Sequence, residues 1–193
     1  MKGIIIYKGK YGATQQYAQW LSNSLTLPLL KAENAGPGTL EKYDLVILGS
    51  SVYIGKLIIR EWLKQNLAAL AGKKLFLFVV CGTPADAKDE LQKIIENNLD
   101  AATRKRTKVF FLPGRCVVSK LYWTDRFMLK MGAMLEKDPK KKATMKSDYD
   151  LMDEKQLDSL IAAAREYPGS VLGHAGNNNI SIKKGAQDVR DIK

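Results

Sequence analysis

Apolar residues along this chain fall into two kinds of pattern. Continuous apolar runs at residues 4–7, 44–49, 73–80 and 108–112, with a shorter candidate at 27–31, are typical of strands buried on both faces of a parallel sheet. Between the runs, apolar residues recur every three or four positions, as on one face of a helix. These helical sets are Tyr17, Leu21 and Leu25; Ile59, Trp62, Leu63, Leu67 and Leu70; and Leu91, Ile94, Ile95 and Leu99. The alternation predicts an α/β fold with a doubly wound, five-stranded parallel sheet.

Three loops follow strands of this sheet, at residues 8–14, 49–55 and 81–85. With the strand order 2-1-3-4-5, the switch in direction lies between the first and third strands, where such sheets bind their ligands. The loops are therefore expected to converge there. In the third loop, Thr83 is expected to cap the following helix and Pro84 to occupy its first position.

The first loop reads KGKYGAT and leads directly into a helix. The first backbone amides of a helix lack partners within it, so a phosphate can bind there, and Thr14 can donate its hydroxyl. Tight strand-to-helix turns also favour glycine without any ligand, so this loop alone leaves both interpretations open. The chain has neither GxGxxG nor GxxxxGK[ST], the dinucleotide and nucleoside triphosphate motifs.

The second loop carries Ser50, Ser51 and Tyr53. The serine hydroxyls suit a polyhydroxyl chain such as a ribityl group, and the tyrosine ring offers stacking area to a planar ring system. An exposed loop tyrosine without a ligand is an equally good interpretation of Tyr53.

The chain is strongly basic. It has 193 residues, 46% of them hydrophobic, and a net charge of +11, which favours anionic partners such as nucleic acid, a membrane surface or a carboxylated small molecule. Nucleic acid is not expected, because no matching motif is present. We expect no signal peptide, no membrane-spanning segment and no metal site, with His174 solvated and Cys81 and Cys116 reduced in a cytoplasmic protein.

A further apolar stripe follows the fifth strand. Phe127, Met128, Met131, Met134 and Leu135 have helical spacing, and the sequence KDPKKK follows at residues 137–142. Such a stripe is more often part of the core than a contact surface, although it also fits a basic amphipathic segment lying on an anionic membrane. Asp125, near the start of this helix, suits either helix capping or an ion pair.

These motifs resemble those of the flavodoxins. Residues 9–14, GKYGAT, resemble the flavodoxin phosphate loop T/S-x-T-G-x-T, with Gly9 and Tyr11 in place of two hydroxyl residues. Residues 114–116 (GRC) and 122–130 (YWTDRFMLK) resemble the corresponding segment of the flavodoxin-type protoporphyrinogen oxidases, whose W-x-D-R-F-M-like run opens a helical insert. The resemblance implies one flavodoxin-like domain at residues 1–172, an insert at about 115–150 and a polar tail at 173–193.

The resemblance also implies FMN, bound non-covalently in the cytoplasm or at the inner face of the membrane. It implies dehydrogenation of protoporphyrinogen IX, with electrons passed to a quinone. The implied FMN-binding residues are Lys8, Gly9, Lys10, Tyr11, Gly12, Ala13, Thr14, Ser50, Ser51, Val52, Tyr53, Ile54, Gly55, Cys81, Gly82 and Thr83. The candidates for contact with the anionic substrate are Arg115, Tyr122, Trp123 and Arg126.

Two functions remain open at the level of sequence. One is an FMN-dependent oxidoreductase acting on a porphyrinogen-like substrate, for which the basic charge is suitable. The other is a flavodoxin-like protein that passes electrons to a redox partner protein without a small substrate. The sequence assigns no catalytic acid or base.

Overall fold

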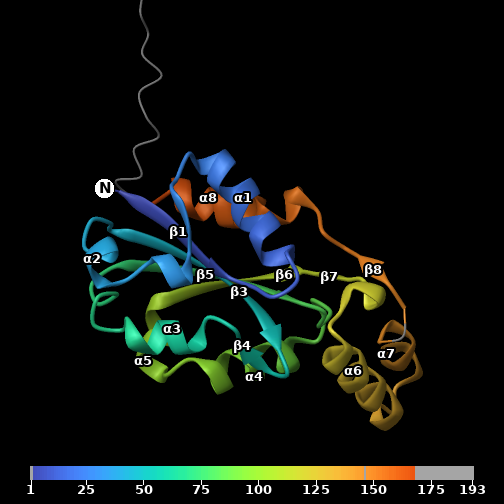
Figure 1. The fold of residues 1–193 in the computed structure, drawn as a ribbon. Coiled ribbons are helices and arrows are strands. Elements are labelled where there is room, and N and C mark those ends of the chain that lie inside the picture. Colours follow the sequence, from blue (N-terminus) through green and yellow to red (C-terminus); the bar gives the residue numbers. More distant parts are fainter. Residues whose placement is uncertain (1, 146, 168–193) are drawn as a thin grey trace, which may run out of the picture.

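The computed structural model describes residues 2–145 and 147–167. Five parallel strands form its central sheet (Figure 1), in the spatial order β2-β1-β3-β5-β6. They are β1 (Gly3–Lys8), β2 (Leu29–Lys31), β3 (Leu45–Tyr53), β5 (Lys74–Cys81) and β6 (Thr107–Pro113). The predicted order of five parallel strands, with its switch between the first and third, is confirmed.

Strand β3 differs most from its predicted length. It continues through Ser50 to Tyr53 and pairs antiparallel with β4 (Lys56–Leu57), so most of the predicted second loop is a β-hairpin. The hairpin turns at Ile54 and Gly55, both in the left-handed region with φ of 49° and 69°. Such a turn matches the twist of the two strands but is unfavourable for a β-branched residue.

Two layers of helices cover the sheet (Figure 1). Helices α1 (Ala13–Leu25) and α8 (Asp158–Arg165) lie on one face, where their apolar side chains join the core formed by Ile5, Ile47 and Phe78. The other face packs against α3 (Arg60–Gln65) and α4 (Lys88–Asn98). The remaining helical elements of this part of the chain are α2 (Pro37–Leu40), α5 (Ala101–Arg106), η1 (Ala32–Asn34) and η3 (Glu154–Leu157).

Several helix boundaries differ from the predictions. Helix α4 begins at Lys88 after the cap residue Ala87, so the predicted cap at Thr83 and first position at Pro84 are wrong. Residues 84–87 form a turn before the helix instead, with hydrogen bonds from the Ala87 amide to the Pro84 carbonyl and from the Lys88 amide to the Asp86 carbonyl. Helix α3 ends at Gln65, earlier than its apolar pattern suggests.

At the centre of the sheet, Gly49 packs closely against a neighbouring aromatic ring. A Cβ on this residue would stand 2.2 Å from the Phe78 ring, and both residues lie in central strands paired in register. Glycine is therefore required at this position by the neighbouring aromatic ring.

The segment after β6 extends beyond the sheet. It contains β7 (Arg115–Cys116), η2 (Val118–Lys120), α6 (Trp123–Leu135), α7 (Pro139–Thr144) and β8 (Tyr149–Asp150), and β7 pairs antiparallel with β8. Figure 1 shows α6 and α7 at the end of the sheet where β3 and β5 finish. The prediction that the Met-rich stripe of α6 belongs to the core is wrong: Phe127, Met134 and Leu135 are 61%, 73% and 78% exposed.

Within the described residues, no helix is both long and apolar enough to cross a bilayer. The predicted tail and His174 lie outside the described residues.

Candidate functional site

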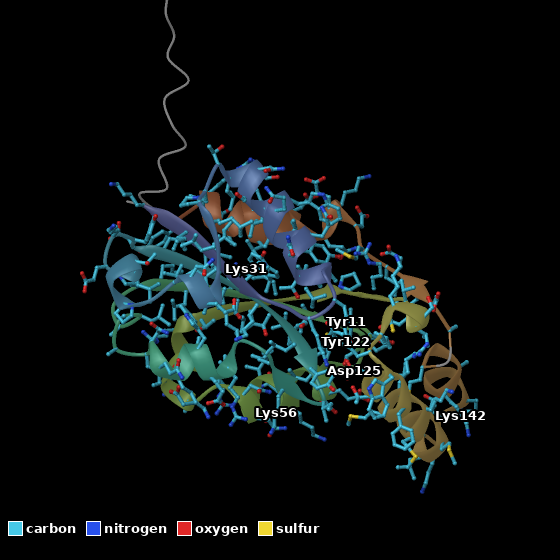
Figure 2. The ribbon with its side chains drawn as sticks, in the orientation of Figure 1. Tyr11, Lys31, Lys56, Tyr122, Asp125 and Lys142 are labelled. Atoms are coloured by element: carbon cyan, nitrogen blue, oxygen red, sulfur yellow. The ribbon has the colours of Figure 1, made fainter. Side chains whose placement is uncertain are left out.

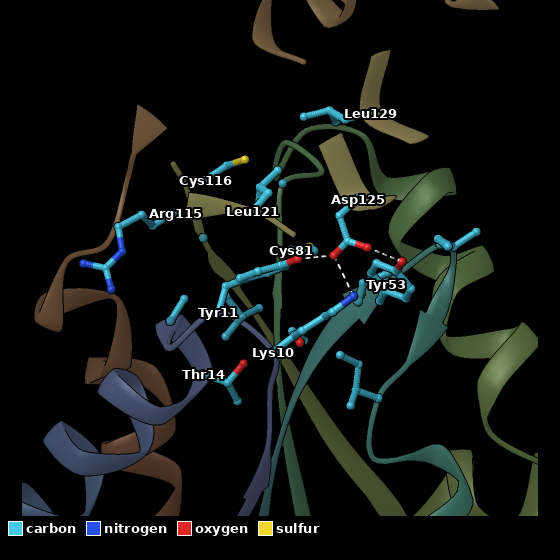
Figure 3. A pocket seen from close by; sticks show the side chains of 18 of the residues that line it. Lys10, Tyr11, Thr14, Tyr53, Cys81, Arg115, Cys116, Leu121, Asp125 and Leu129 are labelled. Atoms are coloured by element: carbon cyan, nitrogen blue, oxygen red, sulfur yellow. Dashed lines mark hydrogen bonds and ion pairs between the residues drawn. The ribbon is translucent and has the colours of Figure 1, made fainter. Parts of the chain in front are cut away.

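A cavity of about 580 Å³ opens at the carboxyl ends of β1, β3 and β5. It lies between the three loops and α6 (Figure 3). Its lining residues are Lys10, Tyr11, Ala13, Thr14, Ser51, Val52, Tyr53, Ile54, Ile58, Val80, Cys81, Gly82, Gly114, Arg115, Cys116, Leu121, Asp125, Met128, Leu129, Gly132, Met145 and Tyr149. Its volume and its apolar wall with a few polar groups are typical of small-molecule sites.

The amino-terminal end of α1 forms one wall of this cavity. Gly12 adopts a left-handed conformation with φ of 87°, and α1 has no acidic residue in its first turn. Thr14 is 1% exposed, and its Oγ1 atom has no hydrogen-bond partner among the described residues. Gly9 makes room for this hydroxyl, because a Cβ there would stand 2.7 Å from Thr14 Oγ1. A buried, unpaired hydroxyl beside the free amides of a helix is suited to an anionic ligand.

The two serines of β3 have different environments. The Ser51 hydroxyl, on the cavity wall, is buried without a hydrogen-bond partner among the residues described. The Ser50 hydroxyl is fully buried, donates to the Ser51 carbonyl and accepts a hydrogen bond from the Ile59 amide. Of the two, Ser51 is therefore placed to contact a ligand, whereas Ser50 holds the chain after β4.

Asp125 of α6 joins the first two loops to the helix. Its Oδ2 accepts hydrogen bonds from Lys10 Nζ at 2.6 Å and from the Tyr11 hydroxyl, and its Oδ1 accepts one from the Tyr53 hydroxyl at 2.7 Å (Figure 3). Burial raises the pKa of Asp125, but these hydrogen bonds and the charge of Lys10 outweigh it and lower the pKa to about 2. Asp125 is thus an ion-pair partner rather than a cap, and it is ionised at neutral pH.

Aromatic rings surround the ammonium group of this ion pair. Lys10 Nζ lies 3.9 Å from the centre of the Tyr53 ring, and the rings of Tyr11 and Tyr122 are 6.0 Å apart. Figure 2 shows Tyr11, Tyr122 and Asp125 grouped near the end of the sheet. Burial and the hydrogen bond to Asp125 raise the pKa of Tyr11, so its hydroxyl keeps its proton at neutral pH.

The third loop and β8 form the opposite wall. Cys81 and Cys116 are free thiols, as predicted, and burial raises the pKa of both. Tyr149 packs its hydroxyl against Gly82, where a Cβ would stand 2.6 Å from it. Both cysteines therefore contribute neutral, weakly polar surface to the cavity.

The structure brings together most of the predicted cofactor residues. Those that line the cavity are Lys10, Tyr11, Ala13, Thr14, Ser51, Val52, Tyr53, Ile54, Cys81 and Gly82, together with Arg115 from the substrate set. Those outside its lining are Lys8, Gly9, Gly12, Ser50, Gly55, Thr83, Tyr122, Trp123 and Arg126. Lys8 instead pairs with Glu33 at 3.0 Å, and Tyr122 and Trp123 are 65% and 75% exposed.

Sequence reasoning did not place Asp125 in the site. It lies 115 positions from Lys10 along the chain, and the only local signal was a charged residue near the start of an amphipathic helix. Leu121, Met128, Leu129 and Tyr149 were missed for the same reason, because the fold of the segment after β6 decides which side chains face the cavity.

A family model for the flavodoxin domain matches residues 4–143, which is most of the chain. The chain belongs to the flavodoxin family. Flavodoxins bind FMN at the carboxyl ends of the strands, at the same switch in strand order. In this protein the family match extends across α6, so the helix that carries Asp125 lies within the matched region.

Individual relatives are more distant. An uncharacterized protein of Methanocaldococcus jannaschii is 28% identical over 85 residues, which cover 44% of this chain and 57% of that protein. The chain thus matches little more than half the length of this relative. Flavodoxin 2 of Bacillus cereus is 23% identical, with 59% of this chain and 85% of that one covered and a TM-score of 0.46. Megasphaera elsdenii flavodoxin is 17% identical, with 58% of this chain and 83% of that chain covered and a TM-score of 0.42.

Proposed function

We propose that this protein binds FMN in the cavity at the ends of β1, β3 and β5 and acts as a flavin-dependent redox protein. The observation that carries the proposal is the buried hydroxyl of Thr14 beside the first turn of α1, which has no hydrogen-bond partner in the part of the chain that the structure describes. A phosphate there would accept hydrogen bonds from this hydroxyl and from the helix amides. The family match supports a flavin as the ligand that brings this phosphate.

The other residues of the cavity fit the remaining parts of FMN. The hydroxyl of Ser51, which is unpartnered within residues 2–145 and 147–167, would bind the ribityl chain. Val52 and Tyr53 on one side, and Cys81 and Gly82 on the other, would hold the ring system. FMN supplies electron transfer when bound, and these residues orient it and exclude water from it.

The proton-carrying groups near the ring site have fixed states at neutral pH. Asp125 is a carboxylate, because its pKa is lowered to about 2, and Lys10 is an ammonium group, because its pKa is raised. Burial lowers the pKa of Lys10, but the hydrogen bonds to Asp125 and Tyr53 outweigh this effect. Their role is to hold α6 against the first two loops rather than to accept a proton from a substrate.

The substrate is the second part of the proposal. We propose a porphyrinogen-like molecule, with electrons passed to a quinone, in a cytoplasmic protein that touches the inner face of the membrane. The supporting observation is the exposed apolar side of α6, including Phe127, Met134 and Leu135, beside a lysine-rich segment in a chain of charge +11. Apolar side chains flanked by lysines suit both a membrane surface and a substrate with propionate groups.

An electron shuttle between proteins is the alternative. The same exposed face of α6 would then contact a redox partner protein. Anaerobic assay of the FMN-loaded protein with protoporphyrinogen and a menaquinone analogue separates the two. Porphyrin fluorescence above the uncatalysed rate supports the enzyme, and its absence favours the shuttle.

Sedimentation with vesicles of anionic or neutral lipid tests the proposed membrane contact. The proposal predicts that the protein binds to the anionic vesicles alone.

The FMN site is tested with the variant Thr14→Val, which keeps the shape of the side chain but removes its hydroxyl. We expect this variant to bind FMN about tenfold more weakly, the usual effect of losing one hydrogen bond to a charged group. Riboflavin, which lacks the phosphate, should bind both proteins equally. The matched control is Thr39→Val in α2, which does not line the cavity. Equal FMN affinity in Thr14→Val and the wild type would place the phosphate elsewhere.

A further inference from the structure

Arg115 occupies a position at the cavity that the substrate role does not explain. It comes from β7, far along the chain from the phosphate loop, yet its Nη2 atom lies 3.9 Å from the point that a Cβ on Gly12 would occupy. Gly12 is the cap residue of α1. Figure 3 shows the Arg115 side chain on the α1 side of the cavity, away from Asp125.

We infer that Arg115 is the residue that makes this site select a phosphate-bearing flavin over an uncharged one. The inference rests on the FMN site proposed above and adds to it a cation that is not part of the first loop. Thr14 provides a buried hydroxyl that none of the described residues pairs with, and Arg115 brings a guanidinium group to the same end of α1. A guanidinium group can donate two parallel hydrogen bonds to a phosphate, so it specifies this ligand by geometry as well as by charge.

The first loop explains why such a residue is needed. Gly9 and Tyr11 offer no hydroxyl to the start of α1, since Gly9 has no side chain and the Tyr11 hydroxyl donates to Asp125. The two lysines of the loop are also engaged, because Lys8 pairs with Glu33 and Lys10 with Asp125. Because both lysines of the loop are paired with carboxylates, Arg115 supplies the positive charge at the start of α1.

The present partner of Arg115 leaves it available to a phosphate. Arg115 Nη1 lies 3.5 Å from Asp150 Oδ2, and the two side chains are 38% and 53% exposed. An ion pair this long and this exposed contributes little to stability, so exchanging part of it for a phosphate is favourable. Arg115 also borders a smaller cavity of about 280 Å³, whose lining contains a second cation, Lys120.

The test compares the affinities for FMN and riboflavin in the wild type, Arg115→Gln and Arg115→Lys. We expect Arg115→Gln to weaken FMN binding by about tenfold or more, as for loss of a hydrogen bond between charged groups, with no change for riboflavin. The FMN affinity of Arg115→Lys should lie between those of the wild type and Arg115→Gln, because lysine keeps the charge but not the paired donors. The matched control is Lys93→Gln on α4, which removes the same charge outside the cavity.

Each outcome bears on the inference. A wild-type preference for FMN that Arg115→Gln retains would overturn it, and so would an equal loss of affinity for both flavins, which would make the residue structural. Thermal unfolding of the variants identifies any that fail to fold, and Arg115→Lys then decides the result. If the wild type binds neither flavin, the proposed function itself fails, a result distinct from an unchanged FMN preference in the variants.

Discussion

The contact between Asp125 and Lys10 determines how firmly α6 is held against the cavity. Replacing Asp125 with Asn keeps the size of the side chain and removes its charge. Burial alone would raise the pKa of Asp125, but its hydrogen bonds and Lys10 lower it from 3.8 to about 2. At about 1.4 kcal/mol for each pKa unit, the ionised carboxylate adds roughly 2 kcal/mol to the free energy of unfolding.

Solvent reduces this figure, because Lys10 is 30% exposed while Asp125 is 6% exposed. We therefore expect Asp125→Asn to lower the free energy of unfolding by about 1–2 kcal/mol at neutral pH. The variant Lys10→Met should lower the free energy of unfolding by a similar amount. The double variant should lower it by less than the sum of the two single effects, since each change removes the same ion pair.

The effect has a defined pH dependence. The folded protein lowers the pKa of Asp125, so the stabilisation is fully present above the unfolded pKa of 3.8 and is lost as the pH falls through about 2. Urea unfolding of the wild type and Asp125→Asn, measured from neutral pH down through this window, should show the difference between them shrinking below about pH 4. Asp86→Asn, which alters an exposed loop residue, is the control and should show no such change.

Two results would refute this reasoning. One is equal stability of the wild type and Asp125→Asn at neutral pH, which would mean that the contact contributes nothing. The other is a difference in the free energy of unfolding between the two proteins that stays the same at acid pH. The lost stability would then come from packing rather than from charge.

Three further substitutions test other parts of the account. Gly49→Ala should lower the free energy of unfolding by about 1–3 kcal/mol in urea titrations, because its new methyl group would overlap the Phe78 ring, and an unchanged midpoint would contradict that packing. Ile54→Gly should raise the unfolding midpoint, by about 1 kcal/mol in free energy, since glycine adopts φ of 49° without strain; a lower midpoint would show that the Ile54 side chain matters more. Arg126→Ala should lower kcat/KM for a propionate-bearing substrate without changing FMN affinity, and equal kcat/KM would remove Arg126 from the substrate site.

The sequence predicts the sheet well because its strands have a strong local signal. Ile4, Ile5 and Ile6 are fully buried, as are Val46 and Ile47, so continuous apolar runs correspond directly to central strands. With the connections restricted to right-handed crossovers, few strand orders remain, and the observed order is the one expected.

The second loop shows where local patterns fail. Ser50, Ser51 and Tyr53 have the composition of a loop, yet they continue β3 because β4 pairs with the end of the strand. That pairing depends on a turn in which Ile54 adopts a conformation unusual for its type, so no local rule predicts it.

The helix α6 shows a second kind of failure. Its apolar spacing suggests a core helix, but it packs against α7 and is hydrogen-bonded through Asp125 to the first loop and the hairpin, rather than packing on an apolar face of the sheet. Asp125 is its buried anchor, and Phe127 and Met134 face outward. Sequence spacing gives the amphipathic face of a helix but not what that face contacts, so the polar anchor appears only in the folded protein.

Titration of the purified protein with FMN and with riboflavin, followed by visible absorbance, tests the central claim most directly. We expect FMN to bind more tightly than riboflavin, because in the proposed site its phosphate would interact with the start of α1. We also expect a dissociation constant for FMN above the low-nanomolar range, since Gly9 and Tyr11 replace the hydroxyl residues of the full flavodoxin motif. A protein that takes up no FMN, or that binds riboflavin equally well, would contradict the account.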